Sequence, residues 1–305
     1  MSGVRKRIRH CGRYGIQSDF RQVSYYTYTP TRAPTGRRRK SQTSTPKQRA
    51  LNNKRSARYL EALTHANFGR GDLLLGLSYA EEHTPKDETE AKKEFGNFIR
   101  RLNYRRKKKN LPPARWIAVT EIGKKGRIHH HVIMDAELDR DEVEELWGRG
   151  YANTKRLKPD PREGLLPVIG YIAKTFKEDD RPKGRRKWEC SKNLIRPWDS
   201  INDNPRMMSR KKMRQMKDLP EDSESMRKII EADNPNYELI SVEKEYREDT
   251  GQWYFFCRMK LSSKQVDDVD NARRARTSEQ ENGKCKTIHH GSVRTKSPPE
   301  HTEQR

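Results

Sequence analysis

The feature that most constrains this chain is a pair of strand-like segments joined by a short, basic turn. Residues 115–120 (RWIAVT) are rich in β-branched and aromatic residues, as β-strands are. Residues 128–134 (IHHHVIM) end in an apolar run. The connection at residues 123–127 (GKKGR) holds two glycines and has the length of a hairpin loop. The sequence therefore predicts an antiparallel β-hairpin here.

Strand alternation determines which polar side chains of this hairpin meet. Successive side chains of a strand point to opposite faces, and directly opposed residues of an antiparallel pair point to the same face. With the loop centred on Lys125, Glu121 lies opposite His129. His131 then shares that face, whereas His130 points to the other one.

One carboxylate and two imidazoles leave coordination positions open on a metal ion. Such a donor set suits a divalent ion that acts on a substrate oxygen better than a closed structural zinc site. We therefore predict that Glu121, His129 and His131 bind Mg²⁺ or Mn²⁺. A histidine run in a basic protein is also typical of an incidental solvated patch, and the in-register glutamate favours the metal site.

The charge of the chain indicates a polyanionic partner. Its 305 residues include 67 Lys and Arg against 43 Asp and Glu, a net charge of +24. This excess favours nucleic acid and is more than solubility requires. Hydrophobic residues are only 31% and charged residues 36%, too polar for one core over the full length. We predict a folded domain at residues 47–262 between a disordered basic arm (1–46) and a disordered tail (263–305).

Several classes of protein are disfavoured by the same sequence. No apolar stretch approaches transmembrane length, and the basic N-terminus lacks the apolar segment of a secretory signal. The four cysteines are scattered without a CxxC pair, which favours a reducing cytosol over a disulfide framework or a zinc ribbon. The phosphate-binding motif G-x-x-x-x-G-K-S/T is missing from the sequence, so unwinding of a duplex would come from a separate helicase or from supercoiling.

Hydrophobic periodicity predicts the remaining elements. Alternation predicts strands at residues 72–79 and a hairpin of 237–246 with 252–260, and helical spacing predicts helices at 46–67, 87–109, 139–147 and within 200–236.

A second motif, GYIAKTF, occupies residues 170–176. On a helix, Ile169 and Ile172 fall on an apolar side, and Tyr171 and Lys174, three residues apart, lie together on the other side. A tyrosine and a lysine so placed can be presented to a substrate. Taken alone, the pattern is more typical of an ordinary amphipathic helix with a boundary tyrosine.

These motifs follow one another in a specific order. An apolar strand (LLLGLSY) comes first, then a glutamate eight residues before H-x-H, then Y-x-x-K about forty residues on. In this order they resemble the HUH endonucleases, the rolling-circle replication initiators of phages, plasmids and small single-stranded DNA viruses. The segments GKKGRIHHHVIM, VIGYIAKTF and RRKWECSKNLIRP look closest to replication-associated proteins of the filamentous-phage gene II type in bacteria. The resemblance covers roughly residues 50–260.

The resemblance implies an α+β fold with a central antiparallel sheet and flanking helices, of ferredoxin or RNA-recognition-motif type. The H-x-H strand would lie inside the sheet, with the tyrosine helix packed beside it. It also implies that Glu121, His129 and His131 bind the divalent metal ion, that Tyr171 is the nucleophile and that Lys174 is the motif lysine.

Two positions depart from the family pattern. The middle residue of H-x-H is usually hydrophobic, and here it is His130. Two-tyrosine relatives carry a second tyrosine four residues after the first, and here that position is Thr175. The chain therefore resembles a single-tyrosine enzyme.

The implied function is initiation of rolling-circle DNA replication. The enzyme would nick single-stranded DNA at a replication origin, forming a 5′-phosphotyrosine and a free 3′-OH. A host DNA polymerase and a separate helicase would be its partners in the bacterial cytoplasm. A mobilisation relaxase or a single-strand transposase would use the same residues. An alternative of another class is a non-enzymatic basic nucleic-acid-binding protein with structural histidines.

Clusters of cations are predicted to make salt-sensitive phosphate contacts. Trp188, which follows one of them, is predicted to stack on exposed bases. The predicted nucleic-acid-binding residues are Arg105, Arg106, Lys107, Lys108, Lys124, Lys125, Arg127, Arg185, Arg186 and Lys187.

Overall fold

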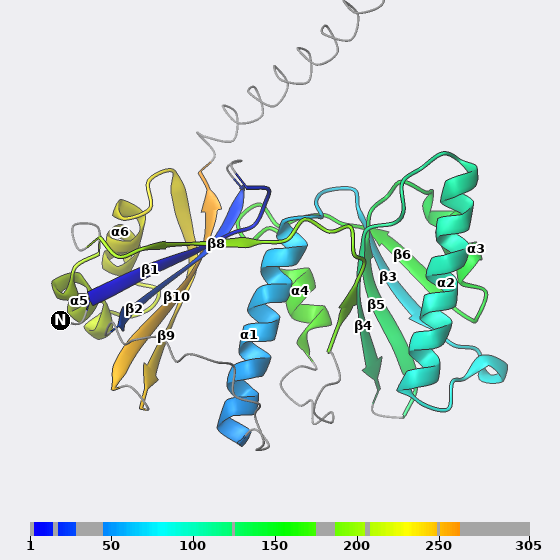
Figure 1. The fold of residues 1–305 in the computed structure, drawn as a ribbon, viewed down its shortest axis with the longest axis horizontal. Helices are drawn as coiled ribbons and strands as arrows, with labels where there is room; N and C mark the ends of the chain where they lie inside the picture. The colour runs from blue at the N-terminus through cyan, green and yellow to red at the C-terminus, as the bar shows by residue number, and fades with distance from the viewer. Residues whose placement is uncertain are drawn as a thin grey trace, which may run out of the picture. The chain divides into compact units, whose positions relative to one another are not determined.

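Two five-stranded antiparallel sheets form the framework of the protein (Figure 1). The computed structural model describes residues 3–14, 18–28, 45–123, 126–174, 187–204, 208–248 and 251–262. Its helices and strands all fall in one unit, Met1–Leu261, whereas the unit Ser262–Arg305 contributes only Ser262 to the described residues. The predicted tail at 263–305 and residues 29–44 of the predicted arm lie outside the described residues.

The first sheet carries the histidines, and we call it the histidine sheet. Its strand order is β6-β3-β5-β4-β7. The strands are β3 (Leu73–Ser78), β4 (Trp116–Ile122), β5 (Ile128–Met134), β6 (Ala152–Arg156) and β7 (Glu189–Cys190).

Helices α2 (Glu88–Lys108) and α3 (Arg140–Trp147) complete a βαββαβ unit with strands β3 to β6. The order of these four strands is that of the split βαβ, or ferredoxin-like, arrangement. The predicted α+β class, with an antiparallel sheet and flanking helices, is confirmed. The histidine-bearing β5 occupies the middle of the sheet, as predicted.

Alternation gives the histidine sheet two apolar faces. Leu73, Leu75 and Leu77 pack with residues of α2 and α3 on one face. The other face presents Ile117, Val119 and Ile133 to the helices α1 (Pro46–His65) and α4 (Leu166–Ile172). One end of this second face carries the polar residues considered below. No described helix is both long and apolar enough to cross a membrane.

The second sheet combines strands from both ends of the described chain, and we call it the terminal sheet. Its order is β8-β1-β2-β10-β9. Its elements are β1 (Gly3–His10), β2 (Phe20–Tyr28), β8 (Trp198–Asn202), β9 (Tyr237–Arg247) and β10 (Gln252–Leu261), with α5 (Arg210–Asp218) and α6 (Glu224–Ala232) between β8 and β9. The histidine sheet is thus inserted in sequence between β2 and β8 of the terminal sheet.

The existence of β1 and β2 corrects one prediction. A disordered arm over residues 1–46 is wrong for residues 3–10 and 20–28, which are paired strands. The composition was misleading because β1 is a strand with one strongly basic face, on which Arg5, Arg7 and Arg9 alternate with residues of the opposite face. The prediction of one central sheet likewise did not include the terminal sheet.

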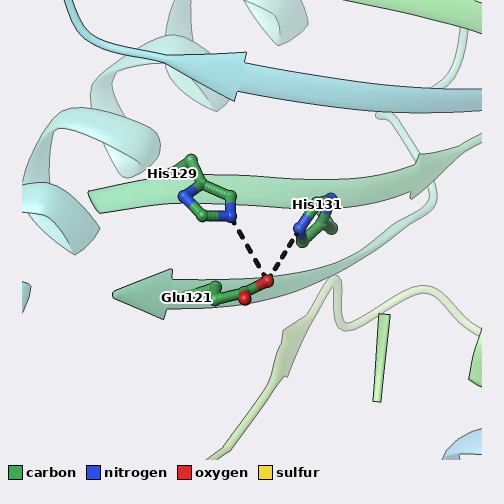
Figure 2. Close-up of side chains that lie close together, drawn as sticks. All are labelled: Glu121, His129 and His131. Atoms are coloured by element: carbon green, nitrogen blue, oxygen red, sulfur yellow. Dashed lines mark hydrogen bonds and ion pairs between the residues drawn. The ribbon is translucent and has the colours of Figure 1, made fainter. Parts of the chain in front are cut away.

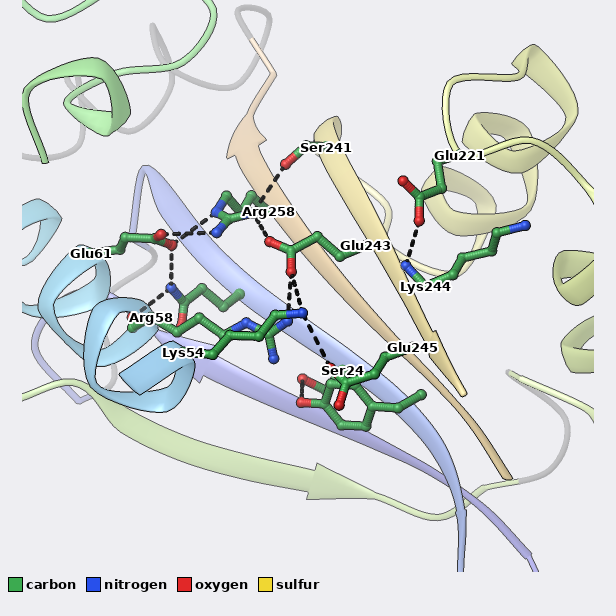
Figure 3. A network of polar contacts seen from close by, with 12 residues as sticks. Ser24, Lys54, Arg58, Glu61, Glu221, Ser241, Glu243, Lys244, Glu245 and Arg258 are labelled. Atoms are coloured by element: carbon green, nitrogen blue, oxygen red, sulfur yellow. Dashed lines mark hydrogen bonds and ion pairs between the residues drawn. The ribbon is translucent and has the colours of Figure 1, made fainter. Parts of the chain in front are cut away.

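Helix α1 contacts both sheets. Its apolar residues Leu60 and Leu63 join the core of the histidine sheet. Its polar residues face β9 and β10, where Arg58 donates to Glu243 at 2.8 Å and Glu61 accepts from Arg258 at 2.8 Å (Figure 3). Because these polar pairs are only partly exposed, they keep α1 on the terminal sheet more firmly than surface ion pairs would.

Candidate active site

The β4–β5 hairpin brings together the three residues predicted to bind metal. Glu121 is paired with His129, and Val119 with His131, which confirms the predicted register. Figure 2 shows the carboxylate of Glu121 directed at both imidazoles from the neighbouring strand. The one-residue alternation of the strands therefore produces the cluster.

The distances in this cluster fit a divalent ion. Oε2 of Glu121 is 3.0 Å from Nε2 of His131 and 3.3 Å from Nε2 of His129. One potential ligand atom from each of the three residues lies within 4.8 Å of the other two. Adjacent ligands of an octahedral ion with bonds of about 2.1 Å are separated by about 3 Å. Only small side-chain adjustments would therefore place all three donors around one ion.

The protonation states also suit metal binding. Burial alone would raise the pKa of Glu121, but the hydrogen bond from His131 and the nearby His129 and Lys174 lower it below its ordinary value. Burial lowers the pKa of His131, and this outweighs the opposing effect of its hydrogen bond with Glu121. The site thus favours an ionised carboxylate and a neutral His131, the forms that coordinate a metal.

His130 points to the opposite face, as strand alternation predicts. It is fully buried, with Nε2 2.7 Å from the Tyr79 hydroxyl and Nδ1 3.0 Å from the Thr120 hydroxyl. The Tyr79 hydroxyl donates in turn to the carbonyl of Ala91 at 3.1 Å. Burial lowers the pKa of His130 to about 3, which keeps the ring neutral. His130 is a core residue that joins β5 to its neighbours.

Helix α4 presents Tyr171 and Lys174 to the cluster. Ile169 and Ile172 are buried and attach the helix to the sheet, and Tyr171 is left 52% exposed. The Tyr171 ring lies 5.1 Å from the His131 ring, edge to face.

Lys174 follows directly after α4 and faces the same cluster. Its Nζ lies 3.7 Å from Oε1 of Glu121 and 4.8 Å from the centre of the Tyr171 ring. The predicted pairing of Tyr171 with Lys174 is confirmed, whereas their catalytic roles remain predictions. The family position at Thr175 lies outside the described residues.

Strand β3 contributes residues that the sequence analysis did not single out. Ser78 is paired with His129 and Gly76 with His131, so both lie on the face of the cluster. Asn153 of β6 is paired with Gly76 and continues the same row. A Cβ added at Gly76 would meet nothing within 4 Å, so there is open space beside His131. This signal was hidden because it depends on β3 pairing with β5.

The basic end of α2 corrects another prediction. Arg106 is fully buried, where its guanidinium contacts Asp135, itself 3% exposed. The prediction that Arg106 contacts nucleic acid is therefore wrong. Arg105 donates to Glu142 at 2.8 Å but keeps a partly exposed side chain.

The other predicted phosphate contacts have different standings. Lys107, Lys108 and Arg127 are exposed, and Lys187 is partly exposed. Lys124, Lys125, Arg185 and Arg186 lie outside the described residues. Contact of any of these residues with nucleic acid remains a prediction.

Trp188 belongs to the packing around the histidine sheet. Its ring stacks on Tyr59 with centroids 6.1 Å apart, and its Nε1 donates to the Ser56 hydroxyl at 3.1 Å. The residue also packs against the core shared by α1 and α4. These contacts give Trp188 a structural role, and base stacking by it remains a prediction.

The segment that contains the site matches a known family. Residues 72–179 match the model of a family of replication-associated proteins, named for ORF2 and the gene II protein. This segment is similar to replication-associated proteins. The match begins at β3 and extends past α4, so it includes Glu121, His129, His131, Tyr171 and Lys174. No curated protein and no solved structure matches the chain.

Proposed function

We propose that the protein initiates rolling-circle DNA replication by nicking single-stranded DNA at an origin. The observation that supports this most strongly is the position of an exposed tyrosine against a metal-binding cluster. Tyr171 contacts His131, and Lys174 contacts both Tyr171 and the Glu121 carboxylate. The family match covers all of these residues and names a replication-associated protein.

The chemistry is transfer of a phosphodiester to tyrosine. A divalent ion bound by Glu121, His129 and His131 would polarise the scissile phosphate and offset the charge on its oxygens. The deprotonated oxygen of Tyr171 bonds to phosphorus as the bond from phosphorus to the 3′ oxygen breaks. The leaving 3′ oxygen takes up a proton and becomes a free 3′-OH, and the 5′ phosphate stays on the tyrosine.

Lys174 acts on the tyrosine and on the phosphate. Its ammonium, close to the Tyr171 ring, favours the phenolate over the phenol by charge attraction. Its exposed end can also contact a phosphate oxygen. The phosphotyrosine bond conserves the energy of the original phosphodiester, so attack by a 3′-OH rejoins DNA without ATP. A host polymerase would extend the 3′-OH and a separate helicase would unwind the duplex, in the bacterial cytoplasm.

The direct test is formation of a covalent protein–DNA adduct. Purified protein is mixed with single-stranded oligonucleotides from its own replicon and Mn²⁺, then analysed on a denaturing gel. We expect a metal-dependent adduct with wild type, none with Tyr171→Phe, and a normal yield with Tyr104→Phe, which alters an equally exposed tyrosine on α2.

Each outcome of this test has a clear meaning. An adduct that persists in Tyr171→Phe would show that another residue is the nucleophile. Binding without cleavage of any oligonucleotide from the replicon would support the non-enzymatic binding protein. A cleaved site at a transfer origin or a transposon end, instead of a replication origin, would identify a relaxase or a transposase.

A further inference from the structure

A groove on the terminal sheet is separate from the candidate active site. Its volume is about 570 Å³, and it lies between α1 and the face of β1, β2 and β10. None of the described residues that line it is acidic, and five of them are arginines: Arg7, Arg9, Arg55, Arg58 and Arg247. The volume is within the range of about 300–1,000 Å³ that is typical of ligand pockets.

Strand pairing explains why this face of the sheet is polar. Arg7 is paired with Ser24, and Tyr26 with Tyr254, so these four side chains share one face. The intervening residues Val23, Tyr25, Phe255 and Cys257 are completely buried on the other face. The sheet therefore buries one face in its core and leaves the other to α1 and to solvent.

Aromatic rings form the floor of the groove. The rings of Tyr26 and Tyr254 lie side by side with centroids 5.8 Å apart and planes at 28°. The guanidinium of Arg247 lies 4.2 Å above the Tyr254 ring. Both tyrosines are partly exposed, so a flat ligand can reach the stacked pair.

The charge around the groove is not balanced. Arg7 and Arg9 both contact the one carboxylate of Asp199, which neutralises only half of their charge. Arg55 is exposed on α1. Arg58 differs, because it is 7% exposed and bound to Glu243 within the network that attaches α1 (Figure 3). The positive charge open to a ligand therefore comes from Arg7, Arg9 and Arg55.

We infer that this groove binds single-stranded DNA. Phosphates would contact Arg7, Arg9 and Arg55, and an unpaired base would stack on Tyr26 or Tyr254. An aromatic and basic sheet face is how several protein modules hold single strands, because every base offers a flat surface for stacking. A duplex is excluded from this mode since its bases are already stacked. The site needs neither a metal nor Tyr171, so it extends the proposed function and does not depend on it.

The test is binding of a fluorescent oligo-dT by the full-length protein in EDTA, measured by anisotropy at several salt concentrations. Tyr254→Ala should weaken binding by about 5- to 100-fold, the effect expected of one stacking residue. Arg55→Glu should weaken binding and reduce its salt dependence. Tyr246→Ala and Lys228→Glu are the matched controls, an exposed tyrosine on the opposite face of β9 and an exposed lysine on α6, and both should bind as wild type.

Additional measurements protect this test from a loss of folding. Tyr254→Phe keeps the ring but loses the 2.7 Å hydrogen bond to Ser24, and it should bind DNA nearly as well as wild type. Photocrosslinking of 5-iodouracil DNA should label Tyr26 or Tyr254. Wild-type affinity in both Tyr254→Ala and Arg55→Glu would overturn the inference, and so would equal competition by duplex DNA or tighter binding of oligo-rU.

Discussion

Replacing His130 and His129 in turn should separate protein stability from metal binding. His130→Val removes two hydrogen bonds, worth about 1 kcal/mol each, and the packing of the ring against Phe95 and Trp147. The total loss in the free energy of unfolding should be about 2–4 kcal/mol. At about 2–4 °C per kcal/mol for a domain of this size, the melting temperature should fall by about 4–16 °C.

His129→Ala should have the opposite profile. The side chain of His129 is 30% exposed, and its removal should change the free energy of unfolding by at most about 0.5 kcal/mol. Loss of a metal ligand should weaken binding by at least the roughly 100-fold upper range seen for residues that only support ligands.

Two measurements on each variant decide the matter. Thermal denaturation in EDTA gives the stability, and calorimetric titration with Mn²⁺ at a temperature where both variants are folded gives the affinity. His130→Val should bind Mn²⁺ within about twofold of wild type. The structural reasoning is refuted if His130→Val loses Mn²⁺ affinity as His129→Ala does and keeps its melting temperature, because the middle histidine would then be a ligand.

Three further changes test other parts of the structure. Arg106→Met leaves the Asp135 carboxylate without its buried partner and should cost about 3–5 kcal/mol in thermal or urea denaturation, whereas Lys107→Met should cost almost nothing. Burial lowers the pKa of His65 to about 4, so the unfolded chain is protonated first as the pH falls. The free energy of unfolding should drop by about 3 kcal/mol between about pH 6.5 and 4 in wild type relative to His65→Gln, and equal pH profiles would contradict this. Gly76→Leu should fill the open space beside His131, reducing adduct formation about tenfold or more with little change in Mn²⁺ affinity; an unchanged adduct yield would place the DNA elsewhere.

The local part of the candidate site could be predicted from sequence. The pairing of Glu121 with His129 follows from the length of one turn and the two-residue period of strands. The pairing of Tyr171 with Lys174 follows from helical spacing. Both are relations within short segments, where periodicity alone determines direction. Their meeting across α4 and β5 depended on the family resemblance.

Other features depend on contacts between distant segments. The strand character of β2 is stabilised by pairing with β10, more than two hundred residues later, and no local pattern contains that information. Arg106 is a different case, because Ile99, Leu102 and Arg106 have the spacing of one helix face. The run of cations concealed this spacing, although it identifies Arg106 as a residue of the buried face.

The insertion of one sheet within the other determines the order in which the protein can be completed during translation. The histidine sheet is encoded between Leu73 and Cys190, so all of its strands leave the ribosome before β9 is made. The hairpin of β1 and β2 must wait for Tyr237–Leu261, roughly 10–40 s at about 5–20 residues per second. During this interval β2 has an unpaired edge that invites aggregation. A nascent chain thus carries the nicking residues before it carries the complete groove.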